Sequence, residues 1–259
     1  MSQYAVVTGA STGLGRCIAL ELARRKINTI LVALPGEGLQ NVCEECRAAG
    51  TASEYFEFDL TDKDALMDFA AKVNAGYDVN ILVNNAGLGG SKRFGDVSFG
   101  YVNTIIQVNV AATALLTYEL LPNLRKNAQS YILNISSMAG LIPTGYKTVY
   151  PASKAFIKHF SLGMREEFRP DGISVSFAVL GPMPTKAEII SRINRQGFIG
   201  KVLSVSPEKV AKVCVRKLFR KRRVIVPGKL NALSFHLVKL VPEYLRGILM
   251  SRSVRKHEL

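Results

Sequence analysis

A glycine-rich turn near the start of the chain constrains its fold more than any other feature. Gly9, Gly13 and Gly15 follow the β-rich run of residues 4–8, and an apolar pattern of helical spacing begins at residue 16. A strand, a glycine turn and a helix in this order suit the phosphates of a dinucleotide, because the backbone can approach closely and the helix N-terminus offers free N–H groups. The spacing is G-x-x-x-G-x-G rather than the more familiar G-x-G-x-x-G. A structural turn that holds no ligand is the alternative.

Apolar runs of strand length alternate with helical patterns along most of the chain. We expect strands near residues 4–8, 28–33, 53–58, 79–83, 130–136, 173–179 and 223–226. We expect helices near residues 14–26, 37–49, 62–73, 99–126, 149–169 and 207–220. This alternation predicts an α/β fold, a doubly wound, mostly parallel, Rossmann-like sheet of order 3-2-1-4-5-6-7 with helices on both faces. No linker or repeat divides the 259 residues, so residues 1–259 are expected to form a single domain.

Tyr150 and Lys154 form a second informative pattern, because residues four apart lie on one face of a helix. A phenol has a pKa of about 10, and an ammonium group nearby lowers such a pKa by roughly 1–3 units, which suits proton transfer near neutrality. Ser137 precedes Tyr150 by thirteen residues, and its hydroxyl can donate to a substrate oxygen that gains charge. Ser136 competes for that role. An ordinary amphipathic helix with Tyr and Lys on its wet side is the alternative.

Three further segments complete a recognisable pattern. They are residues 84–87 after an apolar run, Asn109 within a long helical stretch, and residues 180–185 after a strand pattern. With the glycine turn and the Ser, Tyr and Lys residues, they resemble the short-chain dehydrogenase/reductase family, in the correct order over about residues 4–185. Further stretches resemble the bacterial subgroup of short-chain reductases of undefined specificity: residues 152–156, 165–168 and 224–228.

The resemblance implies an NAD(P)-dependent oxidoreductase that interconverts a carbonyl and a secondary alcohol by hydride transfer. It gives catalytic roles to Asn109, Ser137, Tyr150 and Lys154. Tyr150 would exchange the proton, while Lys154 would lower the phenol pKa and bind the nicotinamide ribose. Ser137 would orient the substrate oxygen, and Asn109 would hold a water near Lys154. A catalytically silent nucleotide-binding regulator or scaffold on the same fold is the alternative.

The resemblance also assigns the cofactor contacts. They are Gly9, Ser11, Thr12, Gly13, Leu14, Gly15, Asp59, Leu60, Asn85, Ala86, Gly87, Tyr150, Lys154, Gly181, Pro182 and Thr185. Enzymes of this type carry an acidic residue after the second strand for NAD, or Arg for NADP. Residues 32–36 contain neither, and the habit of the subgroup favours NADP over NAD. The family usually has Pro-Gly where this chain has Leu180 and Gly181, so the shape of that loop departs from the pattern.

Positive charge is concentrated in the C-terminal part. Residues 201–259 hold fifteen Lys or Arg and three Glu, which gives +12 of the total net charge of +14. Residues 229–259 combine this charge with many apolar residues, a composition typical of a segment that rests on anionic lipid. Packing of the same segment on its own or a partner subunit is the alternative. We expect no nucleic-acid binding, because positive charge is the only feature that supports it.

No metal site is expected. Cys43 and Cys46 have the spacing of half a zinc or redox motif on a surface helix, but no second ligand pair accompanies them. Cys17 and Cys214 fall on apolar helix faces and are expected to be small core residues.

Residues 183–205 are expected to form a substrate lid, because apolar residues are spread among polar ones there. With Met138, Leu141, Ile142 and Tyr146, they imply a mostly apolar pocket. A lipid-like ketone fits such a pocket, for example a 3-oxoacyl group, a ketosphingoid base or a steroid. Internal packing or a dimer contact is the alternative for the lid's apolar residues.

The location and partners follow from the same observations. The chain has no basic-then-apolar leader before its first strand, so we expect a cytoplasmic protein. If its C-terminal segment binds lipid, the protein would contact the inner face of an anionic membrane peripherally. The expected partners are a small hydrophobic substrate and further copies of the chain in a homo-oligomer.

Overall fold

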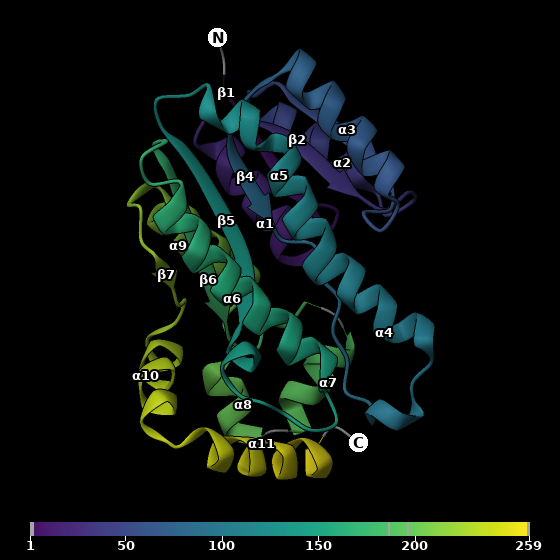
Figure 1. Ribbon diagram of the computed structural model, residues 1–259, viewed down its shortest axis with the longest axis vertical. Helices are drawn as coiled ribbons and strands as arrows, with labels where there is room; N and C mark the ends of the chain where they lie inside the picture. Colours follow the sequence, from purple (N-terminus) through teal and green to yellow (C-terminus); the bar gives the residue numbers. More distant parts are fainter. Residues whose placement is uncertain (1–2, 186, 196, 258–259) are drawn as a thin grey trace.

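A seven-stranded parallel sheet forms the centre of the computed structural model, which describes residues 3–185, 187–195 and 197–257 (Figure 1). The strands are β1 (Gln3–Thr8), β2 (Asn28–Ala33), β3 (Ser53–Glu57), β4 (Asp78–Asn84), β5 (Ser130–Ser137), β6 (Ile173–Leu180) and β7 (Val224–Ile225). Their order is β3-β2-β1-β4-β5-β6-β7, and every neighbouring pair is parallel. The predicted fold class and strand order are confirmed. The order reverses between β1 and β4, and open α/β sheets bind ligands beyond the carboxyl ends of the strands at such a point.

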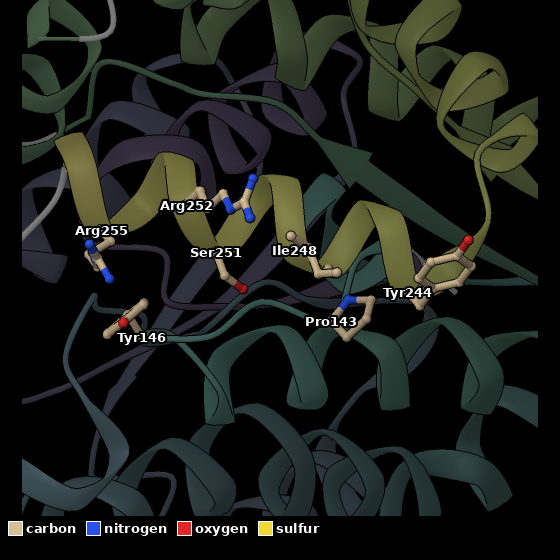
Figure 2. Close-up of a pocket in the computed structure, with 8 residues that line it drawn as sticks. Pro143, Tyr146, Tyr244, Ile248, Ser251, Arg252 and Arg255 are labelled. Atoms are coloured by element: carbon tan, nitrogen blue, oxygen red, sulfur yellow. The ribbon is translucent and has the colours of Figure 1, made fainter.

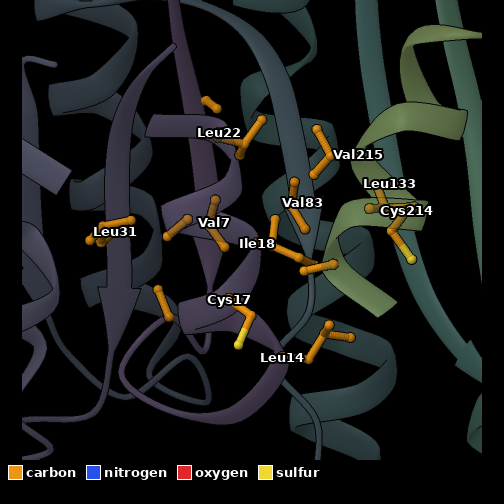
Figure 3. Close-up of a cluster of buried hydrophobic side chains, with 14 of the residues drawn as sticks. Val7, Leu14, Cys17, Ile18, Leu22, Leu31, Val83, Leu133, Cys214 and Val215 are labelled. Atoms are coloured by element: carbon orange, nitrogen blue, oxygen red, sulfur yellow. The ribbon is translucent and has the colours of Figure 1, made fainter. Parts of the chain in front are cut away.

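Two layers of helices cover the sheet because its strands are apolar on both faces. One layer contains α1 (Gly13–Arg24), α2 (Leu39–Ala48) and α9 (Pro207–Phe219), and the other contains α3 (Lys63–Gly76), α5 (Ala112–Arg125) and α6 (Val149–Glu167). In the first layer, Ile18 and Leu22 of α1 and Val215 of α9 pack over Val7 and Val83 of the sheet (Figure 3). The core therefore lies on both sides of the central strands and fixes the positions of their carboxyl ends.

All four cysteines are free thiols in the interior. Cys17 and Cys214 belong to the first core, as expected, but Cys43 and Cys46 also lie on the buried face of α2 rather than on the surface. Burial raises the pKa of Cys46 to about 11 and that of Cys214 to about 12, so these thiols stay protonated near neutrality. No cluster of three or more His, Cys, Asp or Glu suited to a metal occurs among the described residues.

The prediction of one continuous helix over residues 99–126 is wrong in one detail. The stretch divides into α4 (Phe99–Ile106), a π-helical turn (Gln107–Ala111) and α5. Asn109 lies in the π turn, and its side-chain amide bonds to the backbone of Leu88 and to Ser153. A π turn widens a helix locally and is frequent at functional sites. The periodicity of the sequence does not reveal the π turn, because the turn adds only one residue to the helical pattern.

By length and composition alone, one described helix could cross a membrane, the stretch Phe99–Arg125 that includes α4 and α5. Leu116, Leu120 and Leu124 of α5 are buried in the second core. The core helix of a soluble protein passes the same test, and 39% of the apolar window here is buried inside the molecule.

The remaining helices gather at the end of the molecule where β5 and β6 finish (Figure 1). The expected lid, residues 183–205, contains α7 (Ala187–Arg195) and α8 (Gly197–Leu203). The C-terminal segment forms α10 (Lys229–Leu237), a 3₁₀ turn (Val238–Leu240) and α11 (Glu243–His257). Residues 1–2, 186, 196 and 258–259 of the expected domain, lid and C-terminal extension lie outside the described residues.

The inner side of the C-terminal segment packs on its own subunit. Phe235 of α10 and Val254 of α11 are buried, and Arg246 Nη1 donates to Leu141 O at 2.9 Å. Asn231 Nδ2 donates to Leu203 O at 2.9 Å, and Ser251 Oγ accepts from a backbone amide of the loop between β5 and α6. The sequence left open whether this segment packs on its own subunit, and its inner side does so.

The glycine turn gives a test of the fold. A Cβ at Gly15 would lie 2.0 Å from Gly9 O, so Gly15→Ala requires a backbone shift that separates α1 from the turn. We expect this variant to lose about 1–3 kcal/mol of unfolding free energy or more. Chemical denaturation measures the change. Gly163→Ala is the matched control, because no atom lies within 4 Å of a Cβ there, and it should gain about 0.5–1 kcal/mol in the exposed face of α6. Equal stability of the two variants would contradict the close approach.

Candidate active site

Hydrogen bonds join the glycine turn to the segment after β4. Asn85 Nδ2 donates to Thr8 O at 2.9 Å and to Gly9 O at 3.1 Å. In return, Thr8 Oγ1 accepts from the backbone amides of Asn85 at 3.0 Å and Ala86 at 3.1 Å. Sequence reasoning missed Thr8, although a Thr at the end of a strand beside a glycine turn is a usable signal. These bonds hold two expected cofactor segments in one fixed arrangement.

The other expected cofactor residues lie around this arrangement. Thr185 approaches the turn, since a Cβ on Gly13 would lie 3.4 Å from Thr185 Cγ2. Leu60 borders the same small crevice as Thr8 and Ala86. Asp59 is exposed after β3, and its Oδ1 accepts from the amide of a residue two positions on at 2.8 Å. Among the rest, Ser11, Leu14 and Gly15 are buried, Thr12 and Gly87 are exposed, and Gly181 and Pro182 are half-buried.

Two contacts shape the loop after β6. A Cβ on Gly181 would lie 2.6 Å from Asn231 Oδ1, and Pro182 O accepts from Val205 N at 3.2 Å. Because Asn231 belongs to α10, the C-terminal segment supports a loop that is expected to meet the cofactor.

A carboxylate that sequence reasoning missed lies beside the glycine turn. Ser11 Oγ donates to Glu37 Oε2 at 2.7 Å. Glu37 lies one residue beyond residues 32–36, where the cofactor-selecting residue is expected. Within those residues, Ala33 is buried in the core, whereas Leu34 is exposed. Glu37 and Leu34 are therefore the side chains after β2 that can influence a ligand on the turn.

The Asn109 side chain fixes the loop that follows residues 85–87. Its Oδ1 accepts from Leu88 N at 2.8 Å, and its Nδ2 donates to Leu88 O at 2.8 Å and Ser153 Oγ at 2.9 Å. A Cβ on Gly87 would lie 3.2 Å from Asn109 Oδ1 and 3.1 Å from Lys154 Nζ. Asn109, Gly87 and Lys154 therefore meet, and a side chain at residue 87 would press on the other two.

Lys154 is buried, and its Nζ donates to Ile135 O at 3.0 Å. Burial lowers the pKa of Lys154 to about 8, because the charged form loses its hydration. An ammonium has three donors, and this carbonyl takes one of them. Nζ lies 6.0 Å from the centre of the Tyr150 ring, one helical turn earlier. The pair predicted from its spacing is therefore on one face of α6, directed towards the carboxyl end of the sheet.

The two serines after β5 face different surroundings. Ser136 is buried, and its hydroxyl donates to Lys154 O at 2.9 Å, so it ties β5 to α6. Ser137 is half-buried, and its Oγ accepts from Ala139 N at 3.2 Å. The Tyr150 ring packs against Gly89, where a Cβ would lie 3.1 Å from the ring. The structure thus brings Ser137, Tyr150, Lys154 and Asn109 to the carboxyl edge of the sheet, with the glycine turn at the same edge.

The burial of Lys154 gives a prediction for stability. Its pKa falls from 10.5 to about 8 on folding, so the native protein carries a penalty in full below pH 8 that disappears as the pH rises to 10.5. At 1.36 kcal/mol for each pKa unit, the penalty is about 3 kcal/mol. We expect Lys154→Met to raise Tm at pH 7 and to lose this advantage near pH 10.5. Thermal melts across this range measure it, and Lys72→Met on the exposed face of α3 is the control. A lower Tm for Lys154→Met at pH 7 would show that the ammonium stabilises the fold instead.

Comparisons with known proteins agree with this geometry. The model of the short chain dehydrogenase family matches residues 3–196. The chain is 32% identical over 197 residues to very-long-chain 3-oxoacyl-CoA reductase of Anas platyrhynchos, covering 74% of this chain and 63% of that protein. It is 33% identical over 200 residues to 17-beta-hydroxysteroid dehydrogenase type 3 of Mus musculus, covering 76% of this chain and 64% of that protein. The chain thus matches less than two thirds of the length of these relatives.

A solved structure extends the similarity to nearly the whole chain. The short-chain dehydrogenase from Sphingobium yanoikuyae, in complex with NADPH, has a TM-score of 0.78 and 25% identity. The match covers 94% of this chain and 97% of that one. With the family match, the strand order and the residues gathered at the carboxyl edge of the sheet, this shows that the chain belongs to the short-chain dehydrogenase family.

Proposed function

We propose that the protein reduces an apolar ketone to a secondary alcohol with a nicotinamide cofactor. The observation that carries the proposal is the buried Lys154, one turn from Tyr150 and beside Asn109, at the edge of the sheet that also holds the glycine turn. A buried ammonium is costly and is retained where it serves chemistry. The spare donors of Lys154 and the cradle at Gly87 fit the hydroxyls of a ribose.

In the proposed reaction the bound cofactor supplies a hydride to the carbonyl carbon. Tyr150 donates its hydroxyl proton to the carbonyl oxygen, which becomes the hydroxyl of the product alcohol. Lys154 stabilises the resulting phenolate through its positive charge. Ser137 donates a hydrogen bond to the oxygen while charge develops on it. Asn109 positions the Leu88 loop, and the second lone pair of its Oδ1 can hold a water beside Lys154.

NADP is the proposed cofactor. The similar enzyme from Sphingobium yanoikuyae was solved with NADPH, and no acid occupies residues 32–36 of this chain. The exposed Thr12 hydroxyl is the donor that would meet a 2′-phosphate, because the single proton of the Ser11 hydroxyl is donated to Glu37. The carboxylate of Glu37, which accepts a hydrogen bond from Ser11, would repel that phosphate. The preference for NADP over NAD is therefore expected to be modest.

A lipid-like ketone is the proposed substrate. Met138, Leu141 and Ile142 follow Ser137 at the end of β5, and Tyr146 precedes Tyr150, so apolar side chains flank the proposed reacting groups. The expected lid helices α7 and α8 lie at the same end of the molecule (Figure 1). The two relatives are named for a 3-oxoacyl-CoA and a hydroxysteroid, which are both lipid-like.

The proposal extends to assembly and location. We propose a homo-oligomer, since Leu115 and Tyr118 of α5 and Phe156 of α6 are exposed apolar residues on helices that cover one face of the sheet. We also propose that the enzyme works in the cytoplasm in peripheral contact with an anionic membrane, in keeping with the basic and apolar C-terminal segment.

Tyr150→Phe separates the reductase from a catalytically silent nucleotide-binding protein. The variant keeps the ring against Gly89 but lacks the proton donor, so we expect at least a hundredfold loss in kcat with little change in NADPH affinity. Cofactor oxidation with a panel of apolar ketones measures kcat, and fluorescence titration measures binding. In parallel, Lys154→Met should weaken both turnover and cofactor binding. NADPH binding without turnover of any ketone by the wild type would support the silent protein.

Cofactor choice is tested at the two side chains after β2. Glu37→Gln keeps the size of the side chain and removes its charge, so the kcat/KM ratio of NADPH to NADH should rise about tenfold. Leu34→Asp adds a carboxylate at an exposed position and should shift the ratio towards NADH. The control is Glu44→Gln on the exposed side of α2, which leaves the turn untouched. An unchanged ratio in both test variants would show that neither side chain meets the adenosine ribose.

A further inference from the structure

The outer side of the C-terminal segment is apolar and uncovered. On α10, Leu230, Leu233 and Leu237 are exposed, whereas Asn231 and Phe235 face inwards. Leu240 in the 3₁₀ turn is 79% exposed and Leu249 of α11 is 61% exposed. Tyr244 and Ile248 are exposed too, but they line a cavity on the other side of α11. The remaining exposed large apolar residues here are Leu230, Leu233, Leu237, Leu240, Val241, Leu245, Leu249 and Met250. We call this set the outer face. Soluble proteins rarely leave so many neighbouring apolar side chains in water.

The outer face is a feature of an ordered segment. The inner contacts of Asn231, Arg246 and Ser251 hold the two helices on the body of the protein. The apolar side chains therefore point outwards because the helices present two different sides, one packed and one not. Along α11 the outer residues Leu245 and Leu249 are one turn apart.

Positive charge surrounds the outer face. Residues 229–257 hold six Lys or Arg and one Glu. Lys229, Lys239, Arg252, Arg255 and Lys256 are exposed, whereas Arg246 is turned inwards to Leu141 O. Within the described part of the chain, none of them forms an ion pair with a carboxylate. Burial, and after it the nearby charges of Lys158 and Arg223, lower the pKa of Lys239, so two further cations lie close to its ammonium.

We propose that the outer face docks the protein on the surface of an anionic lipid bilayer. Apolar side chains enter the boundary between headgroups and acyl chains, while the surrounding Lys and Arg bind lipid phosphates. A second copy of the chain is a poorer occupant. A two-fold contact would place two surfaces rich in Lys and Arg against one another, and these charges repel.

The docked surface lies next to the proposed active site. A cavity of about 470 Å³ separates α11 from the loop that joins β5 to α6. In Figure 2, Tyr244 faces Pro143 at one end of this cavity and Arg255 lies beside Tyr146 at the other, with Ile248 and Ser251 between them. Tyr146 lies four residues before Tyr150, in the turn that precedes α6. A ketone that leaves the bilayer at this cavity therefore enters close to Tyr150, and this part of the inference rests on the proposed function.

Vesicle co-sedimentation without substrate tests the docking. The full-length protein should bind vesicles of phosphatidylcholine with phosphatidylglycerol, bind phosphatidylcholine alone much more weakly, and detach as salt rises. Leu240→Ser with Leu249→Ser should weaken binding about tenfold or more, and Arg252→Gln with Arg255→Gln should do the same and flatten the salt dependence. The matched control is Met67→Ser with Lys72→Gln, because both residues are exposed on α3, far from α11 (Figure 1). Substitution is preferred to truncation, since truncation also removes the inner contacts.

Three results would overturn the docking. The first is no binding of the wild type at low salt, and the second is equal loss in the control variant. The third is a wild-type dimer that does not bind vesicles and becomes a monomer in Leu240→Ser with Leu249→Ser. This result would assign the outer face to a second copy of the chain. Melting temperatures and NADPH binding in solution should be unchanged in every variant.

A kinetic comparison separates this inference from the proposed function. The two leucine substitutions should raise KM for an apolar ketone carried in anionic vesicles and leave KM for a water-soluble ketone unchanged. If the variant has the same KM as the wild type for the ketone carried in vesicles, entry from the bilayer is overturned. Absence of turnover with any ketone would reject the proposed reaction and leave the vesicle-binding result standing.

Discussion

The burial of the Lys154 ammonium is the constraint around which the rest of the site is arranged. Its Nζ reaches Ile135 O of β5, and its backbone carbonyl accepts from Ser136, so α6 is tied to the end of that strand at two points. Gly87 lacks a side chain where Lys154 and Asn109 meet, and Asn109 lies in the π turn between α4 and α5. Elements from three parts of the chain thus converge on one charge that is costly to bury.

A second network does the same for the glycine turn. Thr8 and Asn85 exchange hydrogen bonds between the end of β1 and the segment after β4, where the strand order reverses. The two networks adjoin through residues 85–88. The protein therefore has a rigid, hydrogen-bonded centre at the carboxyl edge of the sheet, while α10 and α11 cover the neighbouring end with an apolar exterior.

The motifs with fixed spacing could be predicted from the sequence because they act through local geometry. Tyr150 and Lys154 are one helical turn apart in any helix, and the strand order follows from alternating strands and helices with right-handed crossovers. Period-2 alternation also separates Ser136 from Ser137. The contact between Glu37 and Ser11 was not predicted, because it is made across a loop. The π turn at Asn109 was not predicted, because it adds only one residue to a helical pattern.

The C-terminal segment shows where sequence alone stops. Its composition, basic and apolar together, is fixed by the residues and allows either packing or membrane contact. Only the tertiary structure divides the segment into an inner side, with Asn231, Phe235 and Val254 against the body, and an outer side led by Leu240 and Leu249. The physical reason is that helical periodicity shows which residues share a side, whereas the neighbour on each side is set by long-range packing. The sequence by itself determined the fold class and the spacing of the proposed reacting groups, and the tertiary structure decided which surfaces remain for a partner.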